Sequence, residues 1–99
     1  MTPKDFRFFQ ETLNLSKPSS KWPLALQALW WAAKGDWEAS HTIAQDLHTP
    51  MGSWIHAYLH RVEGDDWNAG YWYRKAGKPF SKWDLEVELE KLIEENLKG

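Results

Sequence analysis

Histidines are the residues of this sequence best suited to chemistry near neutral pH, because imidazole changes charge there and also ligates metals. His56 and His60 are four residues apart, and Glu63 follows three residues later. On a helix these side chains occupy an arc of about 60°, next to the apolar stripe. Two imidazoles at this spacing can point at one divalent ion such as zinc, so His56 and His60 are the candidate metal ligands. The residues between them lack the glutamate of a zinc protease motif, which excludes that class.

His41 is a third candidate, on the preceding predicted helix. If that helix packs beside the helix of His56 and His60, His41 meets one of them, and the three imidazoles with Glu63 form a proton-active pocket. A structural role is the alternative, in which the histidines bridge neighbouring helices by hydrogen bonds or stay solvated. His48, near the end of the same predicted helix, is more readily explained as a surface residue that interacts favourably with the helix dipole when charged.

Aromatic residues form a second group of candidates, with eight tryptophans and three tyrosines in 99 residues. In the predicted helix 66–76, Trp67 and Tyr71 lie on one face near Arg74, and the other aromatic residues lie on another face. We expect the last helix to cover the face of Trp67 and Tyr71. If that face stays uncovered, it becomes a candidate binding surface, because exposed aromatic patches mark interaction sites.

The elements that must position these residues are all helical, because the alternating Val, Ile and Thr runs of strands are missing. We expect six helices: one that begins at Thr2, four over about 22–34, 37–47, 51–63 and 66–76, and one that begins at Ser81. Thr2 and Ser81 each open a capping-box sequence that an aspartate closes three residues later. The predicted fold class is therefore all-α.

An internal repeat organises the middle of the chain. Residues 28–36 align with residues 57–65, and both segments end in Gly-Asp. The simplest explanation is two antiparallel helical hairpins, each turning at its Gly-Asp corner. Neither hairpin can bury its apolar face alone, so we expect the two to stack, with the first and last helices as end pieces.

The second hairpin resembles a tetratricopeptide repeat. In residues 64–79 the turn glycine, the small residue, the aromatic residue and the alanine of that motif fall at Gly64, Ala69, Tyr73 and Ala76. The first hairpin offers Gly35, Trp37, Ser40, Ala44 and Leu47 at the matching places. The resemblance covers residues 22–79, with units of about 22–48 and 51–79. It implies binding of a partner peptide or protein rather than catalysis.

The usual partner-clamping residues of that family are not carried over, since Trp and His stand at the groove positions. The stretch from Trp54 to Arg61 and on through Tyr71 to Arg74 also resembles small bacterial proteins of uncharacterised activity.

Composition excludes several classes of protein. The absence of cysteine excludes a disulfide scaffold and cysteine-based metal sites, and is compatible with the cytoplasm. No apolar run reaches 18 residues, and Met1 is not followed by a signal-like segment. The net charge of -2 lacks the basic footprint of a nucleic-acid binder. The Glu-rich segment 84–95 is most simply a solvated helix face.

These observations predict one all-α domain over residues 1–99 that is more an interaction module than an enzyme. We expect it to bind a protein or peptide, or a second copy of itself, through an aromatic-rich groove, without nucleic acid, membrane or cofactor. The alternative is a small-ligand or metal site, with hydrolysis as one option, in which zinc or a similar divalent ion is the cofactor. The candidate binding residues are His41, His56, His60, Glu63, Trp67, Tyr71 and Arg74, and no catalytic residue is assigned.

Overall fold

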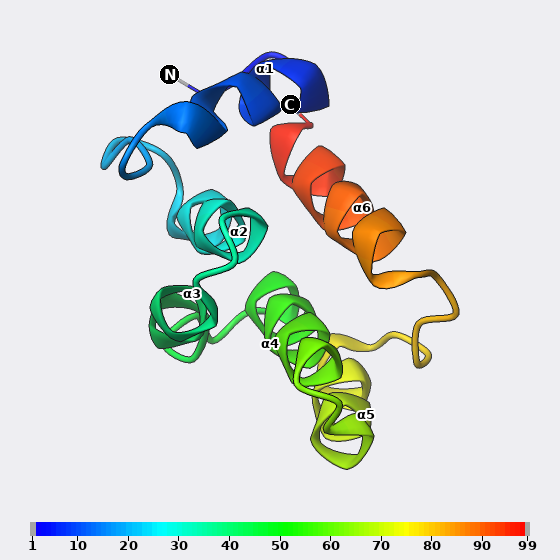
Figure 1. Cartoon of the computed structure of the whole chain (residues 1–99). Coiled ribbons are helices and arrows are strands. Elements are labelled where there is room, and N and C mark those ends of the chain that lie inside the picture. Colours follow the sequence, from blue (N-terminus) through cyan, green and yellow to red (C-terminus); the bar gives the residue numbers. More distant parts are fainter. Residues whose placement is uncertain (1, 99) are drawn as a thin grey trace.

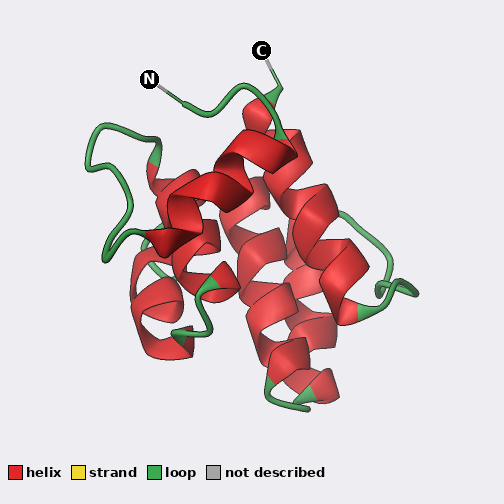
Figure 2. Ribbon diagram, turned by 45° about the horizontal axis from the view of Figure 1, so that its top comes forward, coloured by secondary structure: helices red, strands yellow, loops and turns green. Residues whose placement is uncertain are grey.

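The computed structural model describes residues 2–98 and confirms the predicted all-α class, since those residues contain helices and no strand (Figure 2). The elements in chain order are α1 (Phe6–Glu11), the short 3-10 helix η1 (Thr12–Asn14), α2 (Leu24–Ala33), α3 (Trp37–Ala44), α4 (Pro50–Val62), α5 (Asp66–Ala76) and α6 (Leu85–Leu97). None of the helices within residues 2–98 has both the length and the apolar character that crossing a bilayer requires.

The helices pack mainly as two consecutive pairs, α2 with α3 and α4 with α5. Helix α6 packs against α2 and α4, and α1 crosses near the C-terminal end of α6 (Figure 1). Helix α4 is the centre of this arrangement, because α2, α3, α5 and α6 all contact it. Residues 52–59 of α4 are therefore all buried.

The two Gly-Asp corners have the same backbone shape. Gly35 and Gly64 adopt left-handed φ values of 83° and 81°, a conformation that costs little only for glycine. In each corner the aspartate N–H donates to a carbonyl five residues earlier, at 2.9 Å. The carboxylates of Asp36 and Asp65 then cap the next helix by accepting from the backbone N–H three residues later. The two Gly-Asp corners are therefore built as matching turns.

The core is built from large side chains of five helices, α4 among them. Its fully buried members include Phe9, Leu26, Leu29, Trp30, Ile55, Leu59, Tyr73, Leu92 and Ile93. Trp30 also donates its indole N–H to the Thr12 hydroxyl at 3.0 Å, which ties α2 to η1. Gly52 allows α4 to approach the preceding loop, because a Cβ there would overlap the carbonyl oxygen and the Cβ of Leu47.

Three helices begin later than predicted. Helix α1 starts at Phe6, because Asp5 rather than Thr2 caps it by accepting from the Phe8 N–H. Pro23 precedes α2 as its N-cap residue instead of lying in the first turn. Helix α6 starts at Leu85, and the hydroxyl of Ser81 accepts from the Trp83 N–H in a local turn instead of capping the helix.

The remaining boundaries differ little from the prediction. Helix α3 ends at Ala44, three residues early, and the N–H groups of Asp46 and Leu47 donate to carbonyls three residues earlier, as in a turn. Helix α4 covers Pro50–Val62, one residue earlier at each end than predicted. Helix α5 occupies Asp66–Ala76 as predicted, and Gly77 ends it in a left-handed conformation.

Candidate metal centre

Three of the four histidines come together in space. They belong to α3 and α4, which pack against each other (Figure 1). His56 and His60 are one helical turn apart on α4, and α3 brings His41 to them. The Nε2 atoms of His41 and His56 are 3.0 Å apart, so one ring donates a hydrogen bond to the other. One nitrogen of each imidazole lies within 4.8 Å of one nitrogen of each of the other two. The meeting of His41 with the pair on α4 is therefore as expected.

Two tryptophans stack on rings of this histidine cluster. The ring of His41 stacks on Trp37 with centroids 4.6 Å apart, and the ring of His56 stacks on Trp72 at 3.9 Å. Trp37 is held in turn, because its indole N–H donates to the Leu59 carbonyl of α4 at 2.7 Å. Each indole therefore covers one face of the imidazole on which it stacks.

His60 completes the cluster and has a carboxylate partner. Its ring stacks on His56 at 5.0 Å, and its Nδ1 lies 3.1 Å from an oxygen of Glu63. In the tautomer that carries its proton on Nδ1, toward Glu63, the Nε2 atom of His60 has a free lone pair. A carboxylate on the far nitrogen of a ligating histidine is the usual arrangement around metals. Asp65 lies near the same pair and offers another oxygen ligand.

The environment favours the neutral forms of the His41 and His56 imidazoles. Burial, together with smaller contributions from charge repulsion by His41 and His60, lowers the pKa of His56 to about 4. Burial also lowers the pKa of His41, with His60 adding to the shift and the carboxylates of Glu38 and Glu63 opposing it. Both rings are therefore uncharged at pH 7, which is the form that binds a metal ion.

The donor set fits a divalent transition metal. Imidazole suits zinc, copper, nickel and iron, and three histidines leave a fourth position open. Tetrahedral bonds of 2.0–2.1 Å require nitrogen atoms about 3.3 Å apart. The nitrogen atoms here lie within 4.8 Å of one another, so binding requires every pair that is wider than the tetrahedral spacing to come closer. The near-parallel rings of His56 and His60 must also tilt, because parallel rings do not aim two lone pairs at one point.

His48 is exposed after the end of α3 and does not join the cluster, in line with its expected surface position. The other predicted site residues lie elsewhere. Trp67, Tyr71 and Arg74 are exposed on the outer side of α5, where Trp67 has 79% and Tyr71 42% of its surface accessible. The expectation that the last helix covers this face is wrong. Helix α6 packs on α2 and α4 instead, because its apolar stripe is buried there.

The structure contains a second polar cluster, around Glu88, that the sequence did not lead us to predict. The expectation that the acidic residues of segment 84–95 form a solvated helix face is wrong at Glu88, which is fully buried. Glu88 lies three residues after Leu85 and four before Leu92, so helical spacing puts it on the apolar stripe. That spacing is the signal that marks it as a buried acid.

Glu88 accepts hydrogen bonds from three different side chains. Arg61 donates to one carboxylate oxygen at 2.6 Å, and Trp54 and the Tyr73 hydroxyl donate to the other at 3.0 and 2.5 Å. Arg61 also donates to the Trp83 carbonyl at 3.0 Å. Burial raises the pKa of Tyr73, and its hydrogen bond to Glu88 raises it further, so the phenol stays protonated. The network joins α4, α5 and α6 at one point.

Similarity to known proteins does not identify either cluster. Comparisons of the chain with protein-family models, curated proteins and solved structures return no match.

Proposed function

We propose that this protein binds a divalent transition metal, with Zn²⁺ as the reference ion, through His41, His56 and His60. The observation that carries the proposal is the convergence of three imidazoles from two helices, with one ligand nitrogen of each within 4.8 Å of the others. A structural role for His56 needs one hydrogen-bond partner, which His41 supplies. The third ring and its carboxylate, Glu63, add nothing to that role but are what a metal site requires.

Calorimetric titration of the metal-free protein with ZnCl₂ tests this function. We expect one ion per chain, and Co²⁺ should give the visible absorption bands of tetrahedral coordination. His56→Ala and His60→Ala should each abolish tight binding, and Glu63→Gln should weaken it by about 10- to 100-fold. His48→Ala is the matched control, because His48 is an exposed histidine outside the cluster. Equal affinities for His48→Ala and His56→Ala, or no binding at micromolar zinc, would refute the metal site.

A second candidate function, binding of a protein partner, is supported by the outer side of α5. Trp67 and Tyr71 are exposed there one turn apart, and Arg74 follows on the same side. Trp, Tyr and Arg are the residues that dominate binding energy in interfaces. A tetratricopeptide-like stack of the two hairpins would suit the same non-enzymatic role, and their matching corners support it.

The simplest partner to test is a second copy of the chain. Sedimentation of the protein over a range of concentrations should show a dimer that Trp67→Ala weakens. Phe8→Ala, which removes an exposed ring of α1, should leave the dimer unchanged. A monomer at all concentrations would rule out self-association through α5.

A further inference from the structure

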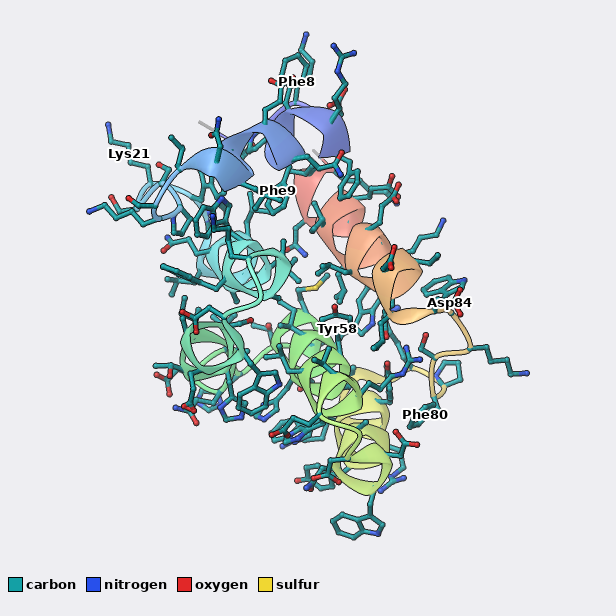
Figure 3. All side chains as sticks on the ribbon, viewed as in Figure 1. Phe8, Phe9, Lys21, Tyr58, Phe80 and Asp84 are labelled. Atoms are coloured by element: carbon teal, nitrogen blue, oxygen red, sulfur yellow. The ribbon has the colours of Figure 1, made fainter. Side chains whose placement is uncertain are left out.

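A cavity of about 410 Å³ lies beside the Glu88 network, between the α4–α5 hairpin, the start of α6 and the connecting segment 77–84. Its floor includes Trp54 and Tyr73, which are buried, and its sides include Phe80 and Trp83, which are partly exposed. Figure 3 shows Phe80 on this segment beside α5. Pockets of this size with aromatic walls take small organic molecules, whose flat rings pack against indole and phenyl groups.

The charges around this cavity are positive. Lys78 and Lys82 line it, and neither forms an ion pair with any residue in the described part of the chain. The ammonium of Lys78 lies 4.2 Å from the ring centroid of Trp54, so it already stands over the aromatic floor. Asp84, the acidic residue of the segment, is not part of the lining.

The one acidic group at the floor offers no free negative charge. Glu88 is fully buried, is paired with Arg61 and accepts from two further donors. A cationic ligand would therefore meet Lys78 and Lys82 without an unpaired carboxylate to neutralise it. An anionic group would meet two unpaired ammonium groups instead.

We propose that this cavity binds a small planar aromatic anion, such as an aromatic carboxylate. The ring system lies among Trp54, Phe80 and Trp83, and the acidic group pairs with Lys78 and Lys82. This proposal does not depend on the metal site. At 100° per residue, Trp54 and Arg61 lie on the side of α4 opposite His56 and His60.

Titration with 2-naphthoate, followed by the indole N–H signals in nitrogen-correlated NMR spectra, tests the proposal. We expect saturable shifts of the Trp54 and Trp83 signals and little change at Trp37. The neutral 2-naphthylmethanol should bind about tenfold more weakly, since it lacks the charged hydrogen bonds. The cationic 2-naphthylmethylammonium should bind more weakly still.

Two pairs of variants separate charge from shape. Lys78→Ala with Lys82→Ala should weaken naphthoate by about tenfold and leave the neutral alcohol unchanged, whereas Lys17→Ala with Lys21→Ala should change neither. Phe80→Ala should weaken both ligands, whereas Phe8→Ala, which removes a ring of equal exposure (43% against 41%), should weaken neither. The lysine variants alter exposed side chains, so they are not expected to unfold the protein.

Four results would overturn the proposal: no shift at millimolar naphthoate, a neutral or cationic ligand that binds as tightly as the anion, a lysine pair that acts like its control, or shifts centred on Trp37. Zinc should leave the affinity for naphthoate unchanged, so failure here is distinguishable from failure of the metal site.

Discussion

Replacing Glu88 by alanine should destabilise the protein by about 3–5 kcal/mol, the cost of removing one partner from a buried ion pair. The structure explains this magnitude by what is left behind. Arg61 loses its ion-pair partner, and the buried Tyr73 hydroxyl and Trp54 N–H lose their acceptor. A buried polar group without a partner costs about 1–3 kcal/mol. The total is a large part of the 5–15 kcal/mol that typically stabilises a domain.

Urea unfolding followed by far-ultraviolet circular dichroism measures this loss of free energy. In a separate thermal unfolding experiment, the melting temperature of Glu88→Ala should be lower by about 12 °C or more, because 1 kcal/mol corresponds to about 4–8 °C in a domain of this size. The stability of Glu88→Gln should lie between those of the unchanged protein and Glu88→Ala, since the amide oxygen of glutamine still accepts hydrogen bonds but the negative charge is gone. Glu94→Ala, at an exposed position of the same helix, is the control and should change stability by less than about 0.5 kcal/mol. A loss below about 1 kcal/mol for Glu88→Ala would show that desolvation cancels the pairing, contrary to our reasoning.

Three further predictions concern pH and glycine. In the metal-free protein the pKa of His56 is about 4, against 6.5 when unfolded, so the unfolded state binds more protons between these values. Stability should therefore fall by about 3 kcal/mol as the pH drops through that window. His56→Gln should remove this component of the dependence of stability on pH. If the stability of His56→Gln changed with pH in parallel with that of the unchanged protein, the prediction would be wrong. Gly52→Ala should cost more than about 2 kcal/mol in urea unfolding because its Cβ meets the Leu47 backbone. Gly70→Ala, whose Cβ meets only ordinary contacts, should instead be neutral or add up to about 1 kcal/mol. Gly35→Ala and Gly64→Ala should each cost about 1–2 kcal/mol, because both corners need the left-handed backbone. Clearly unequal losses would show that the corners do not contribute alike.

The helical class and the two corners were predictable because they depend on neighbouring residues. A glycine followed by a capping aspartate encodes each turn within a few positions, as Gly64 and Asp65 show. Helix starts were harder to predict, because several capping residues compete. Thr2 and Asp5 both suit the start of α1, and only the Asp5 carboxylate accepts from a backbone N–H of the first turn.

The candidate metal site, too, was predictable from the sequence only where it depends on neighbouring residues. The sequence determines that His56, His60 and Glu63 share one face of a helix, because helical spacing is local. The approach of His41 was an expectation conditional on α3 packing against α4. The stacking of Trp72 on His56 depends on how α5 folds back, and no spacing rule specifies it.

In the hydrogen-bond network of Glu88, the sequence places Glu88 on the apolar stripe of its helix. The arginine, the tyrosine and the tryptophan that donate to it lie far from it in the sequence. Only the tertiary structure brings these groups to one carboxylate and leaves the face of Trp67 open. The physical reason is the range of the interactions. Helix spacing and turns are set by bonds between near neighbours, whereas burial of a charge or exposure of an indole is decided by which helices pack together.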